Sequence, residues 1–204
     1  MHRNNHLFTS PDYKEGLKVI LFAVFIAWGI ELLDHIPLIN LDKFGIHPRK
    51  FKSLFGILAM PWLHGSFGHL IANTIPFISL ATLVLLTEKE RFYLTTFKII
   101  LVAGLGTWLI GRPNSVHIGA SSLIYGYFGY LLMRSYLEKK VTWFLLGAFL
   151  LYAYGHLIFG ILPSCKKHIS WEGHLAGLIS GLWIARLLKT KTNDSTLSKT
   201  HRTY

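Results

Sequence analysis

The sequence predicts an all-α membrane protein built from six transmembrane helices. Only 15% of the 204 residues are charged and 51% are hydrophobic, whereas a soluble domain carries roughly 25% charged residues. The hydrophobic residues gather in six runs, each near the roughly 20 residues that a helix needs to cross a bilayer. None of the runs alternates in the manner of a membrane barrel strand. The runs are residues 17–33, 69–87, 94–111, 119–137, 141–162 and 172–188.

The distribution of basic residues gives this bundle an orientation. If the amino terminus is cytoplasmic, the inside segments hold 14 of the 21 Lys and Arg residues and the outside segments hold the other seven. Cytoplasmic segments of membrane proteins carry an excess of Lys and Arg, so we expect both termini in the cytoplasm. The net charge of +11 then reflects membrane topology, because the basic residues lie between the apolar runs. We therefore expect no nucleic-acid partner.

The chain divides into one folded domain and two polar tails. Residues 1–16 form a short cytoplasmic tail that is too polar for a signal peptide. Residues 17–188 hold the six-helix domain, and residues 189–204 form a second cytoplasmic tail. The longest connection, residues 34–63, contains FKSLFGILAMPWL, which is too apolar for an aqueous loop and too short to span. We expect this first outer loop to be partly embedded in the membrane.

Lys98 and Arg134 lie near the cytoplasmic ends of their runs, where their side chains can reach the interface, so histidines are the titratable groups that remain deeper in the apolar runs. All ten carboxylates lie outside the runs or at their ends, and ionisable groups at membrane depth tend to mark function. His69, His156 and His174 lie in the runs, and His64 lies just before the second one. In the orientation above, these histidines and Ser121 lie towards the outer face. A hydroxyl and several histidines without a carboxylate indicate serine chemistry with a histidine base.

The second run carries a pair of hydrogen-bond donors. His69 and Asn73 are four residues apart, so they share one face of a helix. Both side chains can donate towards one point, as an oxyanion hole requires. Taken alone, the pair is better explained by hydrogen bonds to neighbouring helices.

The sixth run brings a histidine close to a small-residue ridge. Gly173, Gly177 and Gly181 recur every fourth residue, which allows another helix to approach closely. If that partner is the fourth run, with its own small residues, His174 can reach Ser121 and act as its base.

The same helical spacing argues for a dyad. Glu172 is two residues from His174, so it points to nearly the opposite side of the helix and cannot orient that ring. Tyr125 lies one turn after Ser121 on the same face, where it can hold the imidazole in place. We therefore expect a Ser-His dyad without a carboxylate.

In this order, these motifs resemble the rhomboid family of intramembrane serine proteases. The resemblance covers residues 17–188 and is carried by an ordered set of positions. These are His64, His69, Asn73, Gly119 with Ser121 in GASS, and His174 in GHLAG. The resemblance implies that Ser121 is the nucleophile, that His174 is the general base, and that Tyr125 packs on its ring.

The resemblance also implies an environment and a substrate. His69, Asn73 and the backbone N–H of Ser121 would form the oxyanion hole, supported by His64 and Gly119. In this family the helices enclose a water-filled cavity that is open to the outer face. The implied partners are the lipid bilayer and membrane proteins whose transmembrane helix unwinds near that face. No cofactor is implied, and a monomer suffices for catalysis.

Two positions depart from the family pattern. Ser122 follows the nucleophile where Gly is frequent, but the spacing from Gly119 and to Tyr125 favours Ser121 as the attacking residue. Phe55 and Gly56 stand where many relatives carry a Trp-Arg pair in the first outer loop. This second departure leaves the anchoring of the loop in the bilayer open.

Other functions remain as alternatives. A catalytically inactive relative would bind transmembrane helices without cutting them. A small transporter would use His64, His69, His156 and His174 as a proton relay, which is the reading that explains His156. No metal is expected, because there is no H-E-x-x-H motif and the single cysteine, Cys165, excludes a Cys-rich site. The composition favours a bacterial cytoplasmic membrane as the location.

Overall fold

The computed structural model describes residues 13–163 and 170–200, and within the last helix it describes side chains as far as residue 188. These parts of the chain are helical, apart from loops and one isolated antiparallel bridge. Each of the six predicted apolar runs overlaps a long helix. The long helices are α1 (Tyr13–Asp34), α3 (Phe67–Thr87), α4 (Phe92–Ile110), α5 (Ser121–Leu137), α6 (Val141–Tyr154) and α7 (Trp171–Thr200).

Four helical segments within the described residues are long and apolar enough to cross a membrane. They are Tyr13–Asp34, Phe67–Thr87, Lys89–Ile110 and Val141–Ile161. The third includes the short helix η5 (Lys89–Arg91) and the fourth continues from α6 into η6 (Gly155–Ile161). Large apolar side chains such as Phe22, Phe25 and Phe144 are exposed on these segments. Such surfaces are expected where a helix faces lipid.

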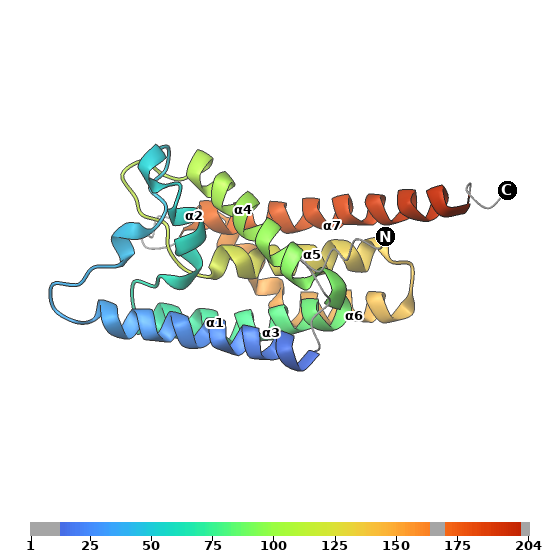
Figure 1. The fold of residues 1–204 in the computed structure, drawn as a ribbon, viewed down its shortest axis with the longest axis horizontal. Helices are drawn as coiled ribbons and strands as arrows, with labels where there is room; N and C mark the ends of the chain where they lie inside the picture. Colours follow the sequence, from blue (N-terminus) through green and yellow to red (C-terminus); the bar gives the residue numbers. More distant parts are fainter. Residues whose placement is uncertain (1–12, 164–169, 201–204) are drawn as a thin grey trace, which may run out of the picture.

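The helix α5 forms the centre of the bundle. It packs against α3, α4, α6 and α7, and Figure 1 shows α7 along one side of it and α1, α3 and α6 along the other. Every residue from Ser121 to Leu131 is buried. With 17 residues, α5 is shorter than the four segments above.

Close contact between α5 and α7 depends on glycine. A Cβ atom on Gly177 would overlap the carbonyl oxygen of Ser122, and one on Gly181 would overlap that of Gly126. The two backbones therefore touch with no side chain between them. Gly173 does not take part in this contact. A Cβ atom on Gly173 would approach Ser170 rather than α5.

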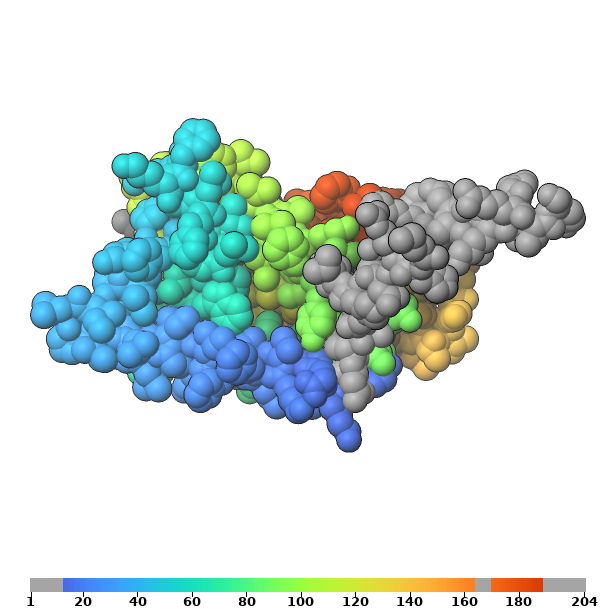
Figure 2. Space-filling model, in the orientation of Figure 1, coloured from blue at the N-terminus to red at the C-terminus, as the bar shows by residue number. Residues whose placement is uncertain are grey.

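The first outer loop consists of short helical turns at one end of the bundle (Figures 1 and 2). These turns are η2 (Asp42–Phe44), η3 (Phe51–Ser53), α2 (Gly56–Ala59) and η4 (Met60–Trp62). In Figure 2, the side chains of the loop and of α1 cover this end of the visible face.

Hydrogen bonds anchor the first outer loop to the end of α4. The Arg49 guanidinium donates to the carbonyl oxygens of Leu109 and Gly111 at 2.9 and 2.8 Å. The Trp108 indole donates to the carbonyl oxygen of Lys50 at 3.1 Å. Carbonyl groups at the end of a helix lack intrahelical partners, so Arg49 supplies part of the cap of α4.

The positions of the missing Trp-Arg pair have their own structural roles. The Phe55 side chain is 67% exposed, so it points away from the protein. A Cβ atom on Gly56 would lie 2.5 Å from the carbonyl oxygen of Gly45. The loop therefore needs glycine at position 56 because its own backbone passes close to that residue.

Candidate active site

The site begins at the first residue of α5. Ser121 donates a hydrogen bond from its hydroxyl to Nε2 of His174, with 3.0 Å between Oγ and Nε2. The other ring nitrogen, Nδ1, lies 2.9 Å from the carbonyl oxygen of Gly160. A carbonyl oxygen only accepts hydrogen bonds, so Nδ1 carries the proton and Nε2 presents a lone pair to Ser121. This is the tautomer that a general base needs.

Tyr125 covers one face of the His174 ring. The two ring centroids are 4.3 Å apart and the ring planes differ by 7°. On the main chain, the N–H of His174 donates to the carbonyl oxygen of Ser170 at 3.1 Å. The imidazole is therefore fixed by a stacked ring, by Gly160 at its edge and by the first turn of α7 below it.

His69 and Asn73 approach the segment that precedes the serine. Gly119 adopts a φ of +108°, a conformation that favours glycine, and a Cβ atom there would lie 2.7 Å from His69 Cε1. The same Cβ would lie 3.6 Å from Asn73 Nδ2. That amide nitrogen is buried and has no hydrogen-bond partner among the described residues. It is thus free to donate to a group that enters the site.

His64 lies behind this segment as a neutral ring. Its Nε2 accepts a hydrogen bond from the backbone N–H of Ala120 at 3.4 Å, and its ring meets that of His69 edge to face at 5.1 Å. Burial lowers the pKa of His64 to about 4. A neutral imidazole can accept from Ala120, so His64 helps to hold the backbone just before the nucleophile.

The dyad, Tyr125 and the two side-chain donors of α3 line one cavity of about 860 Å³. Its walls come from α3, the segment before α5, α5 itself, η6 and α7. The sequence-predicted residues that line it are His69, Asn73, Ser121, Tyr125 and His174. The Ser122 hydroxyl instead donates to the Met60 sulfur at 3.9 Å, and His156 is exposed on η6.

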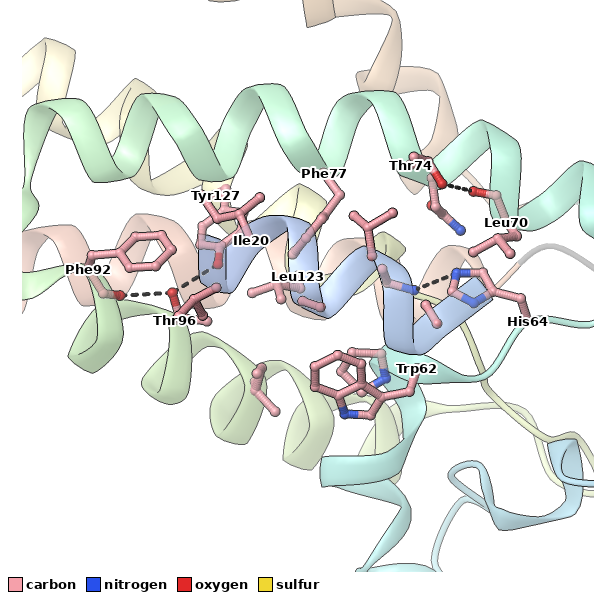
Figure 3. A pocket seen from close by; sticks show the side chains of 18 of the residues that line it. Ile20, Trp62, His64, Leu70, Thr74, Phe77, Phe92, Thr96, Leu123 and Tyr127 are labelled. Carbon is pink, nitrogen blue, oxygen red and sulfur yellow. Dashed lines mark hydrogen bonds between the residues drawn. The ribbon is translucent and has the colours of Figure 1, made fainter. Parts of the chain in front are cut away.

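A second, smaller cavity lies next to the first one. It measures about 140 Å³ and is lined by apolar side chains of α1, α3, α4 and α5. Figure 3 shows Ile20, Phe77 and Leu123 around it and His64 at one end. Asn73 lines both cavities, so they adjoin at this residue.

Several residues of the site were not predicted. Gly160 supplies the carbonyl group that orients His174, and the reactive cavity is also lined by Arg112, His117 and Ser170. The only signal in the sequence was the position of His117, four residues before Ser121. No cluster of three or more His, Cys, Asp or Glu residues able to hold a metal is found in the described part of the chain.

Comparison with known proteins finds related sequences over most of the chain. A family model described as Rhomboid domain matches residues 52–191. Uncharacterized protein Rv1337 of Mycobacterium tuberculosis is 37% identical over 185 residues, which cover 87% of this chain and 77% of that protein. Uncharacterized protein ML1171 of Mycobacterium leprae is 36% identical over 85% of this chain and 71% of its own length. RHOMBOID-like protein 5 of Arabidopsis thaliana is 29% identical over 61% of this chain and 42% of its own length.

Proposed function

The chain belongs to the rhomboid family, and we propose that it is an intramembrane serine endopeptidase that cuts peptide bonds in or near transmembrane helices of other membrane proteins. It is an all-helical, multi-pass membrane protein. The observation that carries the proposal is the 3.0 Å hydrogen bond from Ser121 to His174, in a ring whose tautomer Gly160 fixes.

The reaction follows from this geometry. His174 Nε2 takes the hydroxyl proton as Ser121 Oγ attacks the substrate carbonyl carbon, which gives a tetrahedral intermediate. The resulting imidazolium keeps its Nδ1–H bond to Gly160. It then returns the proton to the leaving amine, and an acyl-enzyme remains on Ser121. A water molecule, deprotonated by His174, releases the acid and restores the serine.

The negative charge of the intermediate would need hydrogen-bond donors, and three are available near Ser121. We assign these as the backbone N–H of Ser121, the Asn73 amide and the His69 ring, supported by Gly119 and His64. The first N–H groups of a helix have no intrahelical acceptor, which leaves that of Ser121 available. Removing a single oxyanion donor typically costs about 10²–10³ in kcat.

We further propose that residues 17–188 form the protease domain with six membrane-crossing helices. The crossing helices would be α1, α3, α4, α5, α6 with η6, and α7. The excess of Lys and Arg on one side supports cytoplasmic termini, and the cavity would then open towards the outer face of a bacterial cell membrane. Its partners would be the lipid bilayer and transmembrane substrates with a small residue before the cut. A monomer contains every group that the mechanism uses.

Two other functions have less support. An inactive helix-binding relative would not need the oriented His174 ring. A histidine relay for transport would need His156 beside the other histidines, but it is exposed on η6 and does not line the cavity. Neither function uses the unpartnered amide of Asn73.

The test is cleavage of a transmembrane reporter by purified protein in liposomes. We expect Ser121→Ala and His174→Ala to abolish cleavage and Ser122→Ala to retain it. Labelling by a fluorophosphonate, which reacts with activated serines, should show the same pattern. If only Ser122→Ala loses activity, the nucleophile is Ser122 rather than Ser121. Absence of cleavage and labelling in the wild type would favour the inactive relative.

A further inference from the structure

A buried histidine that the mechanism does not use lies beside the dyad. His117 is 1% exposed and belongs to the segment between α4 and α5. Its Nδ1 lies 2.6 Å from the Ser170 hydroxyl oxygen, and its Nε2 lies 2.9 Å from that of Ser115. Most polar atoms this deeply buried have hydrogen-bond partners, and both nitrogens of His117 have one.

The direction of these hydrogen bonds follows from a third one. The Ser115 hydroxyl donates to the carbonyl oxygen of Arg112 at 2.6 Å, so its single hydrogen is already used. His117 Nε2 must then donate to Ser115, which leaves Nδ1 as an acceptor for the Ser170 hydroxyl. Burial lowers the pKa of His117 to about 4, which keeps the ring in this neutral form. Ser170 is thus held by a directed bond from its own hydroxyl to His117.

The backbone of His117 is fixed on its other side by the first outer loop. His117 exchanges two main-chain hydrogen bonds with Ile46, at 2.9 and 3.0 Å. Two residues later, the N–H of Gly119 donates to the carbonyl oxygen of Met60 at 2.9 Å. The segment that leads to Ser121 therefore has a defined position before it meets α7.

Ser170 connects this segment to the catalytic base. It directly precedes α7, and its carbonyl oxygen accepts the main-chain N–H of His174. The side chain of Ser170 thus contacts His117 while its main chain contacts His174. An ion pair of 2.8 Å between Arg112 and Glu172 joins the same two segments, with the Glu172 side chain 1% exposed.

We propose that His117 is a positioning residue for the dyad. Through Ser170, it fixes the first turn of α7 so that His174 Nε2 stays within hydrogen-bond distance of Ser121. This role depends on the proposed protease activity and requires no contact between His117 and the substrate. A displacement of about 1 Å in a reacting group can reduce a rate by about 10²-fold, so loss of this link should affect the chemical step and leave substrate binding unchanged.

The experiment compares substitutions that remove or keep the link to Ser170. His117→Phe keeps a ring of similar size but removes both bonds, Ser170→Ala removes one hydroxyl, and His117→Asn places an amide oxygen near the position of Nδ1. His156→Phe is the matched control, because His156 is exposed outside the cavity. The readouts are the rate of fluorophosphonate labelling of Ser121, kcat and KM for a transmembrane reporter, and the unfolding temperature in detergent.

We expect His117→Phe and Ser170→Ala to lower kcat and the labelling rate by about 10–100-fold with KM within about twofold. The double variant His117→Phe/Ser170→Ala should have about the same kcat and labelling rate as the slower single variant, since both changes break the same bond. His117→Asn should recover most of the rate, and His156→Phe should match the wild type.

Two outcomes separate this inference from the protease proposal. If the wild type neither cleaves nor labels, the protease proposal itself fails. If the wild type labels and Ser170→Ala and His117→Asn both keep the full rate while the phenylalanine variant unfolds, His117 serves stability alone and the inference is overturned. A folded His117→Phe variant that is labelled as fast as the wild type also overturns the inference. So does a variant in which only KM rises while kcat and the labelling rate stay unchanged.

Discussion

The phenol ring of Tyr125 lies almost parallel to the imidazole of His174, with 4.3 Å between the ring centroids and 7° between the planes. Both residues belong to the pair of helices whose backbones meet at glycines, so this stack follows directly from the packing of α5 against α7. It restricts rotation of the imidazole about its side-chain bonds, while Gly160 fixes its edge.

The first prediction concerns this stack. Aromatic pairs contribute about 0.5–1.5 kcal/mol beyond burial of their area, and loss of about 1.4 kcal/mol of transition-state stabilisation is a tenfold loss in rate. Tyr125→Phe should keep kcat within about threefold of the wild type, whereas Tyr125→Leu should lower it by about tenfold. Reporter cleavage measures both values. Equal rates in the leucine variant and the wild type would show that the ring does not orient His174.

The second prediction concerns the oxyanion donors. Asn73→Ala and His69→Ala should each lower kcat by about 10²-fold, because each removes a donor from the developing negative charge. Asn73→Asp has nearly the same shape but replaces the donor with an acceptor, so it should be at least as damaging. Steady-state kinetics with the transmembrane reporter distinguish the cases. An active Asn73→Asp enzyme would exclude the amide from the oxyanion site.

The third prediction concerns the contact between α5 and α7. A methyl group on Gly181 would overlap the carbonyl oxygen of Gly126, and overpacking of this kind costs about 1–3 kcal/mol. Gly181→Ala should therefore lower the unfolding temperature and the labelling rate of Ser121 together. Gly29→Ala is the matched control, since a Cβ atom there meets nothing within 4 Å. If both variants behave alike, the glycine contact does not hold the dyad together.

The fourth prediction concerns pH. Burial lowers the pKa of His64 and of His117 to about 4 in the folded protein, whereas an exposed histidine titrates near pH 6.5. Below pH 6.5, the unfolded chain binds protons that the folded protein does not, so the free energy of unfolding falls as the pH drops from 6.5 towards 4. The stabilisation is fully present above pH 6.5. Each histidine contributes a slope of about 1.4 kcal/mol per pH unit.

Unfolding temperatures between pH 7 and pH 5 in detergent test this slope. His117→Asn removes one of these titrating rings, so it should reduce the slope. An unfolding temperature that is independent of pH over this range would mean that neither ring is kept neutral by burial.

The positions of the long helices along the chain could be predicted from the sequence because hydrophobic runs are local signals. The helical positions of Ser121 and His174, and the contact of Gly177 with α5, follow from these runs and from small-residue spacing. Gly173 has the same spacing but faces Ser170, because it lies in the first turn of α7, where the chain has only just joined the bundle. The four apolar segments are identified by length, whereas the buried α5 is shorter.

The remaining parts of the site involve residues far apart in the chain. His117 and Ser170 are separated by 53 positions, and both lie in connecting segments that have no periodic pattern. The Gly160 carbonyl group acts through the main chain, so its residue type carries no sign of this role. Spacing rules describe neighbours on one helix and give no information on such contacts.

The first outer loop holds the segment before Ser121 through the main-chain atoms of Ile46 and Met60. Main-chain hydrogen bonds do not depend on the identity of most side chains. Most residues of this loop can therefore be substituted without loss of these bonds. Positions 45 and 56, where two stretches of backbone touch, allow far less change. Substitutions in this loop are therefore expected to be tolerated at exposed side chains, whereas those that change the path of the backbone should displace the segment before Ser121.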